Sequence, residues 1–386
     1  MNKRKLKYLV AMSIFLTGCF PTQQRGVIEI ESEDVNSLND ASSNLNEYPN
    51  HISEKVSEKL SIDADIVVSK GNLLEKIPVT MFDFDFDKAA TIILGKDHPI
   101  EITNDEWWEK SYINADNDSA SISFRGINYS SSYMLDKPYS RVVEFDNPNF
   151  YIEYPEQELS DLSLDSAKEE VENLMDGIGI EYLENPQVAT LTAEQLISLN
   201  DNLISVKENQ TLTEFNSEDQ AYVLSYRLTF NDLLLTNIGY SLGDSGFSLP
   251  GSRMNFLINS NGIILINGGG LYTELGEPIQ SNLTPISVDQ LISIIKAETD
   301  NLLNVENITI NYIELAYFPM FESVDLEITN SDSIKMTLKP YWIVRYTQDL
   351  QEKDGAISDT GEELLFVDDN LYLIYSAKDG RKLQYY

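Results

Sequence analysis

A single thiol is the side chain of this sequence whose chemistry is easiest to assign. Cys19 is the only cysteine among 386 residues. It directly follows Leu16, Thr17 and Gly18, and these follow a basic start and a short apolar run. A charged start, an apolar run and a small-residue cleavage motif are the three parts of a secretory signal peptide. The sequence therefore predicts a signal peptide at residues 1–18.

The same motif resembles the lipobox of bacterial lipoproteins. In that family the cysteine is diacylated and becomes the first residue of the mature protein, so the resemblance implies a lipid on Cys19. Two acyl chains satisfy the requirement for stable membrane anchoring. Residues 19–49 are polar and poor in aromatic residues, which is typical of a flexible tether. We therefore expect a bacterial protein held by its lipid at the outer face of the cytoplasmic membrane.

Asp83, Asp85 and Asp87 alternate with phenylalanines and are the first candidates for metal ligands. A calcium loop of the EF-hand type also needs glycine after the third acidic position and glutamate six residues beyond that glycine. Lys88 and Leu94 occupy those two positions. The three aspartates are therefore weak candidates for a metal site. The preferred interpretation is the solvent-facing side of a strand, with Asp87 capping the next helix.

Trp107, Trp108 and Trp342 are candidate interface aromatics. Large aromatic side chains are enriched where proteins bind their partners. Neighbouring residues of a strand point to opposite faces, so one ring of the Trp107-Trp108 pair could be buried and the other exposed. An exposed ring could stack on a sugar or anchor a protein interface, and partial burial in a small domain is the alternative.

The remaining residues offer little for catalysis. With two histidines, His51 and His98, and one cysteine, a zinc site of the usual His-rich or Cys-rich type cannot form. Gly268-Gly269-Gly270 lacks the spacing and the following helix of a phosphate-binding loop, so it is expected to be a turn. The sequence thus predicts no enzyme, no catalytic residues and no cofactor. No particular carboxylate pair can be selected from 63 acidic residues for glycoside hydrolysis.

Charge narrows the choice of partners. The chain has 27 basic and 63 acidic residues, with a formal net charge of -36. Such a surface repels nucleic acid and anionic headgroups, and it attracts cations and basic partners. We therefore expect no nucleic-acid partner.

The helices and strands that carry the candidate residues are expected to begin after the tether. An N-terminal α+β region is expected at 50–150, with a short helix near 50–60, strands at 62–69 and 78–86, and a helix at 89–94. The helix near 50–60 is indicated by apolar residues repeated every four positions.

Two later regions, 151–283 and 284–386, share one order of elements. Each begins with a helix whose N-cap is a serine and continues in antiparallel strands. Asn261-Gly262 between apolar runs is a strong hairpin signal, and Asp369-Asn370 is expected at the corresponding turn. A break at Asn147-Pro148 separates them from the N-terminal region. The predicted fold class is therefore α+β, with an N-terminal α+β region followed by two related helix-on-antiparallel-sheet modules.

Three segments of the last region resemble a known family, namely 341–344, 365–368 and 377–383. They are similar to the PepSY-like modules of secreted Gram-positive proteins, which carry a Trp-x-Val strand and a terminal hairpin. They also resemble extracytoplasmic YycH- and YycI-type regulators of sensor kinases, and the whole chain resembles uncharacterised clostridial lipoproteins. Ser376 stands where the family usually has Asp. The resemblance implies a non-catalytic module that inhibits a peptidase or binds an envelope protein.

These observations favour a lipoprotein that acts as a binding or regulatory module on an envelope protein or peptide. Strand addition at a sheet edge is the expected mode. The alternative is a solute- or carbohydrate-binding lipoprotein that uses exposed aromatics, and a hydrolase is a third class. A pocket between modules with converging aromatics would favour solute binding, whereas a flat or grooved apolar patch would favour a regulator.

Overall fold

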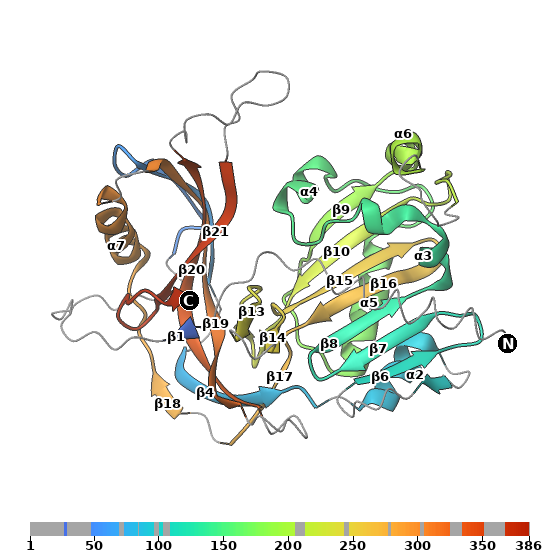
Figure 1. Ribbon diagram of the computed structural model, residues 1–386, viewed down its shortest axis with the longest axis horizontal. Helices are drawn as coiled ribbons and strands as arrows, with labels where there is room; N and C mark the ends of the chain where they lie inside the picture. Colours follow the sequence, from blue (N-terminus) through green and yellow to red (C-terminus); the bar gives the residue numbers. More distant parts are fainter. Residues whose placement is uncertain are drawn as a thin grey trace.

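Two eight-stranded β-sheets stand side by side in the described part of this computed structural model (Figure 1). Among the residues described, no helix is long and apolar enough to cross a membrane. The structure describes residues 27–28, 48–68, 73–83, 85–95, 100–102, 109–204, 213–242, 247–276, 279–301, 305–324, 334–350 and 367–385.

The first sheet is antiparallel throughout and joins two distant parts of the chain. Its spatial order is β5-β6-β7-β8-β16-β15-β10-β9. The strands are β5 (Ile100–Ile102), β6 (Glu109–Ile113), β7 (Ser119–Ser123), β8 (Gly126–Ser130), β9 (Gln187–Leu191), β10 (Ala221–Arg227), β15 (Arg253–Asn259) and β16 (Gly262–Gly269).

Helices cover both faces of this sheet (Figure 1). In β10, Tyr222 and Leu224 pack in the apolar cluster that contains Val171 of the helix α5, whereas Val223 packs in the cluster of the opposite face. Side chains of a strand alternate between faces, so a strand covered on both sides is apolar along its length. The helices are α5 (Leu164–Ile178) on one face and α3 (Ser132–Asp136), η2 (Pro138–Arg141), α4 (Pro148–Glu153) and α6 (Ala193–Ile204) on the other.

The second sheet is mixed, because β19 pairs with β3 in parallel and with β20 antiparallel. Its path is β17-β4-β20-β19-β3-β2, with β18 paired to β4 and β21 paired to β20. The strands are β2 (His51–Lys55), β3 (Leu60–Val68), β4 (Leu74–Met81), β17 (Tyr272–Glu274), β18 (Ile279–Asn282), β19 (Val305–Val324), β20 (Ile334–Leu350) and β21 (Val367–Ser376).

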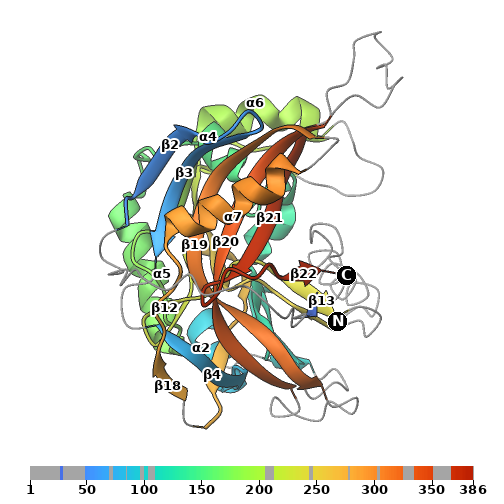
Figure 2. The same ribbon diagram turned by 90° about the vertical axis from the view of Figure 1, so that its left-hand side faces the viewer.

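The helix α7 (Val288–Asp300) lies across β19, β20 and β21 (Figure 2). Its buried residues Val288, Leu291, Ile292 and Ile295 recur at helical spacing and form one apolar stripe. Ser287 is the predicted serine N-cap, and together with Gln290 it forms a capping box that satisfies backbone donors at the start of the helix.

Smaller elements complete the fold. The helix α2 (Phe86–Leu94) ends at the predicted residue 94, with Gly95 as its C-cap, and packs against α5 and β7. The remaining strands form three two-stranded pairs in the described part: β1 (Val27–Ile28) with β22 (Gln384–Tyr385), β11 (Thr229–Phe230) with β12 (Leu233–Leu234), and β13 (Tyr240–Leu242) with β14 (Phe247–Leu249).

The chain combines helices and sheets, as the sequence predicts, but it is richer in strand than a pair of helix-covered modules requires. Residues 50–150 do not form a sheet of their own. Strands β2 to β4 belong to the second sheet and β5 to β8 to the first. This division depends on pairing between residues far apart in sequence, which local patterns do not encode.

The helix predicted near residues 50–60 is wrong, because residues 51–55 form β2 and pair antiparallel with β3. His51 consequently lies on a strand. The spacing of Ile52, Val56 and Leu60 fits a helix, but sheet pairing overrides this local preference. A second error concerns Asp369-Asn370, which lies within β21 rather than at a turn.

The prediction that Gly268-Gly269-Gly270 forms a turn is also wrong. Gly268 and Gly269 belong to β16, and only Gly270, with φ 70°, leaves the strand. A Cβ on Gly268 would lie 2.4 Å from the backbone oxygen of Arg253. The glycines therefore permit close strand packing and are not a flexible turn.

Candidate functional site

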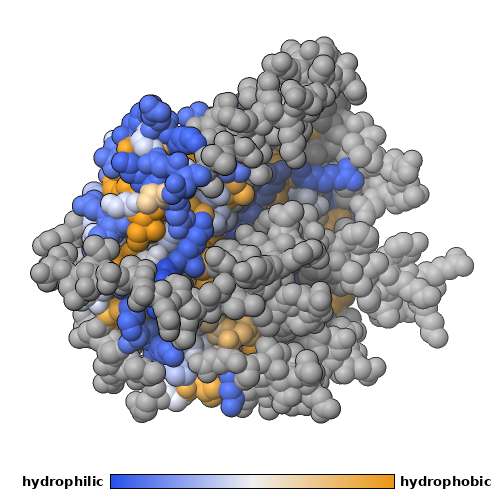
Figure 3. Space-filling model, turned by 60° about the vertical axis from the view of Figure 1, so that its left-hand side comes forward, coloured by the Kyte–Doolittle hydropathy of each residue, from blue (hydrophilic) through white to orange (hydrophobic). Residues whose placement is uncertain are grey.

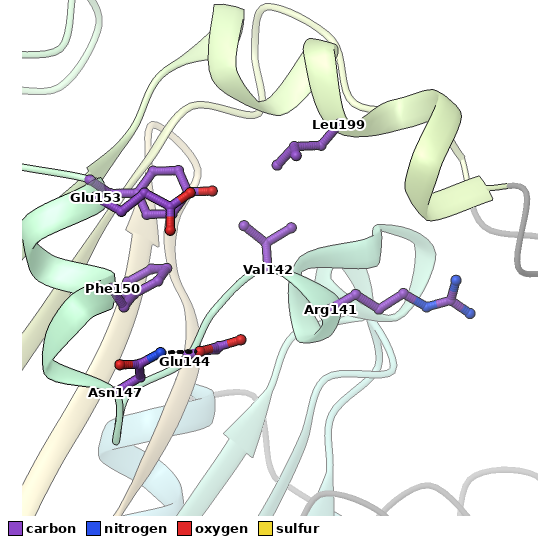
Figure 4. Close-up of a pocket in the computed structure, with 8 residues that line it drawn as sticks. Arg141, Val142, Glu144, Asn147, Phe150, Glu153 and Leu199 are labelled. Carbon is purple, nitrogen blue, oxygen red and sulfur yellow. Dashed lines mark hydrogen bonds between the residues drawn. The ribbon is translucent and has the colours of Figure 1, made fainter. Parts of the chain in front are cut away.

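A pocket of about 220 Å³ lies beside α4 on the first sheet. Residues from the segment before α4, from α4 itself and from α6 surround it (Figure 4). The lining residues are Arg141, Val142, Glu144, Asn147, Phe150, Glu153, Tyr154 and Leu199.

Local sequence explains why α4 starts where it does. The Asn147 side chain accepts a hydrogen bond from the backbone N–H of Asn149 at 3.0 Å, and Pro148 occupies the first helical position. Both features favour helix initiation. The backbone carbonyl of Tyr154 then accepts a hydrogen bond from the N–H of Thr190 on β9, at 3.0 Å. The helix that carries the pocket is thereby fixed at both ends.

Two carboxylates give the pocket its polar side. Glu144 accepts a hydrogen bond from the Asn147 amide at 2.6 Å, and Glu153 lies one helical turn along α4 from Phe150 (Figure 4). Both glutamates are exposed. Arg141 also lines the pocket, and its guanidinium extends away from the other labelled residues (Figure 4).

Aromatic rings form the other side. The rings of Phe150 and Tyr154 have centroids 5.0 Å apart, and Phe150 is buried while Tyr154 is half-buried. Burial raises the pKa of Tyr154, and the charges of Glu153 and Glu144 raise it further. The tyrosine is therefore a neutral hydroxyl within the electrostatic range of both carboxylates.

Two exposed apolar side chains lie on α4 and α6, the helices that contribute Phe150 and Leu199 to the pocket lining. Ile152 on α4 is 76% exposed and Ile197 on α6 is 47% exposed, and they are the two large hydrophobic residues that are exposed in the described part. On the face drawn in Figure 3, coloured hydrophobic and hydrophilic residues are interspersed. The α4 and α6 region thus combines apolar side chains, aromatic faces and negative charge at one place.

Such a combination is suited to a cation on an apolar stem. Carboxylates form charge-assisted hydrogen bonds with ammonium and guanidinium groups. Aromatic faces attract the same cations. The alkyl part of a lysine or arginine can pack against apolar residues while its head reaches the carboxylates. The described pocket offers a recognition surface and holds no arrangement of nucleophile and base.

Asp83, Asp85 and Asp87 do not form a common metal site. The carboxylate of Asp85 caps α2 by accepting from the backbone N–H of Lys88, so Asp85 and not Asp87 is the N-cap. Asp87 accepts from the hydroxyl of Tyr112 at 2.8 Å. Among the described residues, no group of three or more His, Cys, Asp or Glu side chains could hold a metal ion.

Trp342 is not an interface residue. Its side chain is fully buried, and its indole nitrogen donates to the backbone carbonyl of Ile286 at 3.0 Å. The sequence error arose because an apolar strand gives no indication of which face a helix will cover. Trp107, Trp108, His98 and the motif Leu16, Thr17, Gly18 and Cys19 lie outside the described residues.

The sequence predicts a break at Asn147-Pro148 and therefore gives no indication of the pocket beside α4. The same dipeptide is a helix start, since asparagine caps and proline fits the first turn. The spacing of Phe150 and Tyr154, four residues apart, then places both rings on one face of α4. These two signals together could have located the aromatic side of the pocket.

No protein-family model matches this chain, and no curated protein matches it either. The chain is similar to the crystal structure of an uncharacterized protein from Eubacterium rectale ATCC 33656, with 16% sequence identity and a TM-score of 0.64. The likeness covers 87% of this chain and 94% of that chain. At this identity the comparison shows a shared fold and nothing about function.

Proposed function

We propose that this chain is a lipid-anchored extracytoplasmic protein that binds a basic segment of an envelope protein or peptide and has no catalytic role. The observation that carries the proposal is the pocket beside α4, where Glu144 and Glu153 stand next to the rings of Phe150 and Tyr154. Ile152 on α4 and Ile197 on α6 are exposed on the same two helices and would contact apolar neighbours of the basic residue.

The size of the pocket favours a single side chain. Sites for whole small molecules have volumes of roughly 300–1,000 Å³. The pocket here measures about 220 Å³ and is partly charged. A lysine or arginine side chain fits this space better than a sugar or another complete solute. The solute-binding alternative also loses Trp342, which is buried.

The net charge of -36 supports a basic partner. Complementary charge raises the rate of encounter and suppresses partners of like charge. Binding should accordingly weaken as salt increases, because exposed charges are screened over about 10 Å at 0.1 M salt.

The anchor and the modules are parts of the same proposal. Cys19 would carry the lipid, and residues 151–283 and 284–386 would be two related PepSY-like modules built around α5 and α7. The implied partner is a peptidase or a sensor protein of the envelope. Replacing Cys19→Ala should release the protein from membranes or leave it as an unprocessed precursor, and unchanged processing and retention would reject the anchor.

The pocket is tested with trilysine as the probe and tri(acetyl-lysine) as its uncharged counterpart, in a titration with the full-length chain. We expect trilysine to bind more tightly than the acetylated peptide. Glu144→Gln and Glu153→Gln should each weaken trilysine binding by about two- to fivefold, which corresponds to roughly 0.5–1 kcal/mol for an exposed pair.

Glu169→Gln provides the matched control, because Glu169 is an exposed glutamate on α5, away from the pocket. It removes the same charge and should leave trilysine affinity unchanged. Equal weakening by all three variants would show that only overall charge attracts the peptide, and the pocket would then not be the site.

A further inference from the structure

The face of the second sheet opposite α7 carries a polar row. Tyr312 on β19, Arg345 on β20 and Tyr372 on β21 are register partners, so their side chains share one face. Arg345 is three residues from Trp342, which packs toward α7. Because side chains alternate along a strand, Arg345 points to the other side.

Two further arginines approach this row from the first sheet. Arg227 and Arg253 are register partners on β10 and β15, at the ends of these strands. The Nη1 atom of Arg227 donates to Glu314 at 2.7 Å and to the hydroxyl of Tyr312 at 3.2 Å. Three guanidinium groups therefore meet where the two sheets join.

Carboxylates neutralise two of the three cations. Arg227 pairs with Glu314, and Arg253 pairs with Asp146. The Nε atom of Arg345 donates to the neutral amide of Asn311 at 2.8 Å, and its guanidinium lies 5.3 Å from the centroid of the Tyr312 ring. Within the described part of the chain, no carboxylate forms a salt bridge with Arg345.

Tyr372 lies in the field of all these charges. Burial raises its pKa, Arg345, Arg253 and Arg227 each lower it, and Glu314 raises it. Burial also lowers the pKa of Arg253 to about 10, so this cation is poorly solvated. In addition, the Nε of Arg227 and the Oε1 of Glu314 are buried with no hydrogen-bond partner among the described atoms.

Like charges on directly opposite positions of a sheet destabilise it, and partly desolvated cations need a counter-charge. This chain has few cations to place, with 27 basic residues against 63 acidic ones. Glu314 and Asp146 balance Arg227 and Arg253, so Arg345 is the one cation of the three that has no carboxylate partner in the described part of the chain. We propose that Arg345, Arg253 and Tyr372 bind a small oxyanion, a phosphate or carboxylate group, between the two sheets.

The guanidinium fork of Arg345 suits this ligand. It can donate two parallel hydrogen bonds to a pair of oxygens, and the Tyr372 hydroxyl can donate a third. The site differs in charge and in location from the acidic pocket beside α4, so it does not depend on the proposed peptide binding.

The test is isothermal titration of the full-length chain with inorganic phosphate and, separately, with succinate, in chloride buffer at constant ionic strength. We expect saturable binding of at least one of the two. Arg345→Gln should weaken it about tenfold or more, because a bidentate contact is lost. Arg345→Lys keeps the charge without the fork and should show an intermediate affinity. Binding of phosphate alone would indicate a phosphate group, and binding of succinate alone a carboxylate.

Lys335→Gln is the matched control, since Lys335 is exposed on the same strand β20 and its replacement removes one positive charge. It should retain the affinity of the unmodified chain. If Arg345→Gln does not fold, Tyr372→Phe serves in its place and should weaken binding severalfold. The proposal is overturned if neither anion binds saturably, or if the folded variants bind as tightly as the control.

Discussion

At the scale of single residues, His51 connects the edge strand β2 to its neighbour. Its two ring nitrogens lie 2.8 Å from Asp65 and 3.1 Å from Asp63, both on β3. The hydrogen bond with Asp65 is the main cause that raises the pKa of His51 above 6.5, and Asp63 adds to it. The imidazolium is thus favoured in the folded chain relative to the unfolded one.

This linkage predicts the direction of a pH effect. A group whose pKa is raised by folding stabilises the fold fully below its unfolded pKa, and the contribution is lost as pH rises through the folded pKa. Protection of β2 amides from hydrogen exchange should therefore fall as pH rises above about 6.5, after correction for intrinsic rates. His51→Gln should remove this dependence. An unchanged pH profile in that variant would assign the effect to another group.

At the scale of elements, the capping box of α7 is the clearest local stabilising feature. The Ser287 hydroxyl accepts from the backbone N–H of Gln290 at 3.2 Å, and the Gln290 side chain accepts from the N–H of Ser287 at 2.8 Å. Ser287→Ala should lower the free energy of unfolding by about 1 kcal/mol. Chemical denaturation measures this change in the free energy of unfolding. Ser293→Ala, an exposed change on the same helix, should cost less than half as much, and equal costs would contradict the capping role.

Elements set by local signals could be predicted from the sequence. The caps of α5 and α7 and the hairpin turn at Asn261-Gly262 each depend on a few neighbouring residues, and the structure confirms them. The strand β2 and the division of residues 50–150 between two sheets could not be predicted. They depend on partners far along the chain, such as the parallel pairing of β3 with β19.

The candidate site, too, could be predicted only in the part that local sequence determines. Asn147 and Pro148 carry the signal for the start of α4, but nothing local indicates that Leu199 of α6 completes the pocket. Burial of Trp342 likewise follows from the docking of α7 and Ile286, and not from the strand pattern.

At the scale of the whole molecule, the pair of Arg227 and Glu314 links the two sheets. Glu314 is fully buried, and its partner also donates to the backbone carbonyl of Leu235 at 2.8 Å. Glu314→Ala should destabilise the chain by about 3–5 kcal/mol, because a buried guanidinium loses its counter-charge. The double variant that also carries Arg227→Met should recover much of this lost stability, as measured by chemical denaturation. A double variant less stable than Glu314→Ala alone would argue against this origin.

The measurement that tests the central claim most directly is site-specific photo-crosslinking on intact cells. A photoreactive residue would replace Ile197, which is exposed on α6 two residues from the pocket-lining Leu199, or Glu169 on α5 as the control, and mass spectrometry would identify the captured segment. The account predicts that position 197 captures a segment with a lysine or arginine beside the crosslink, and that Glu153→Gln reduces its yield. Equal capture at both positions, or a yield insensitive to Glu153→Gln, would contradict a basic partner bound at this pocket.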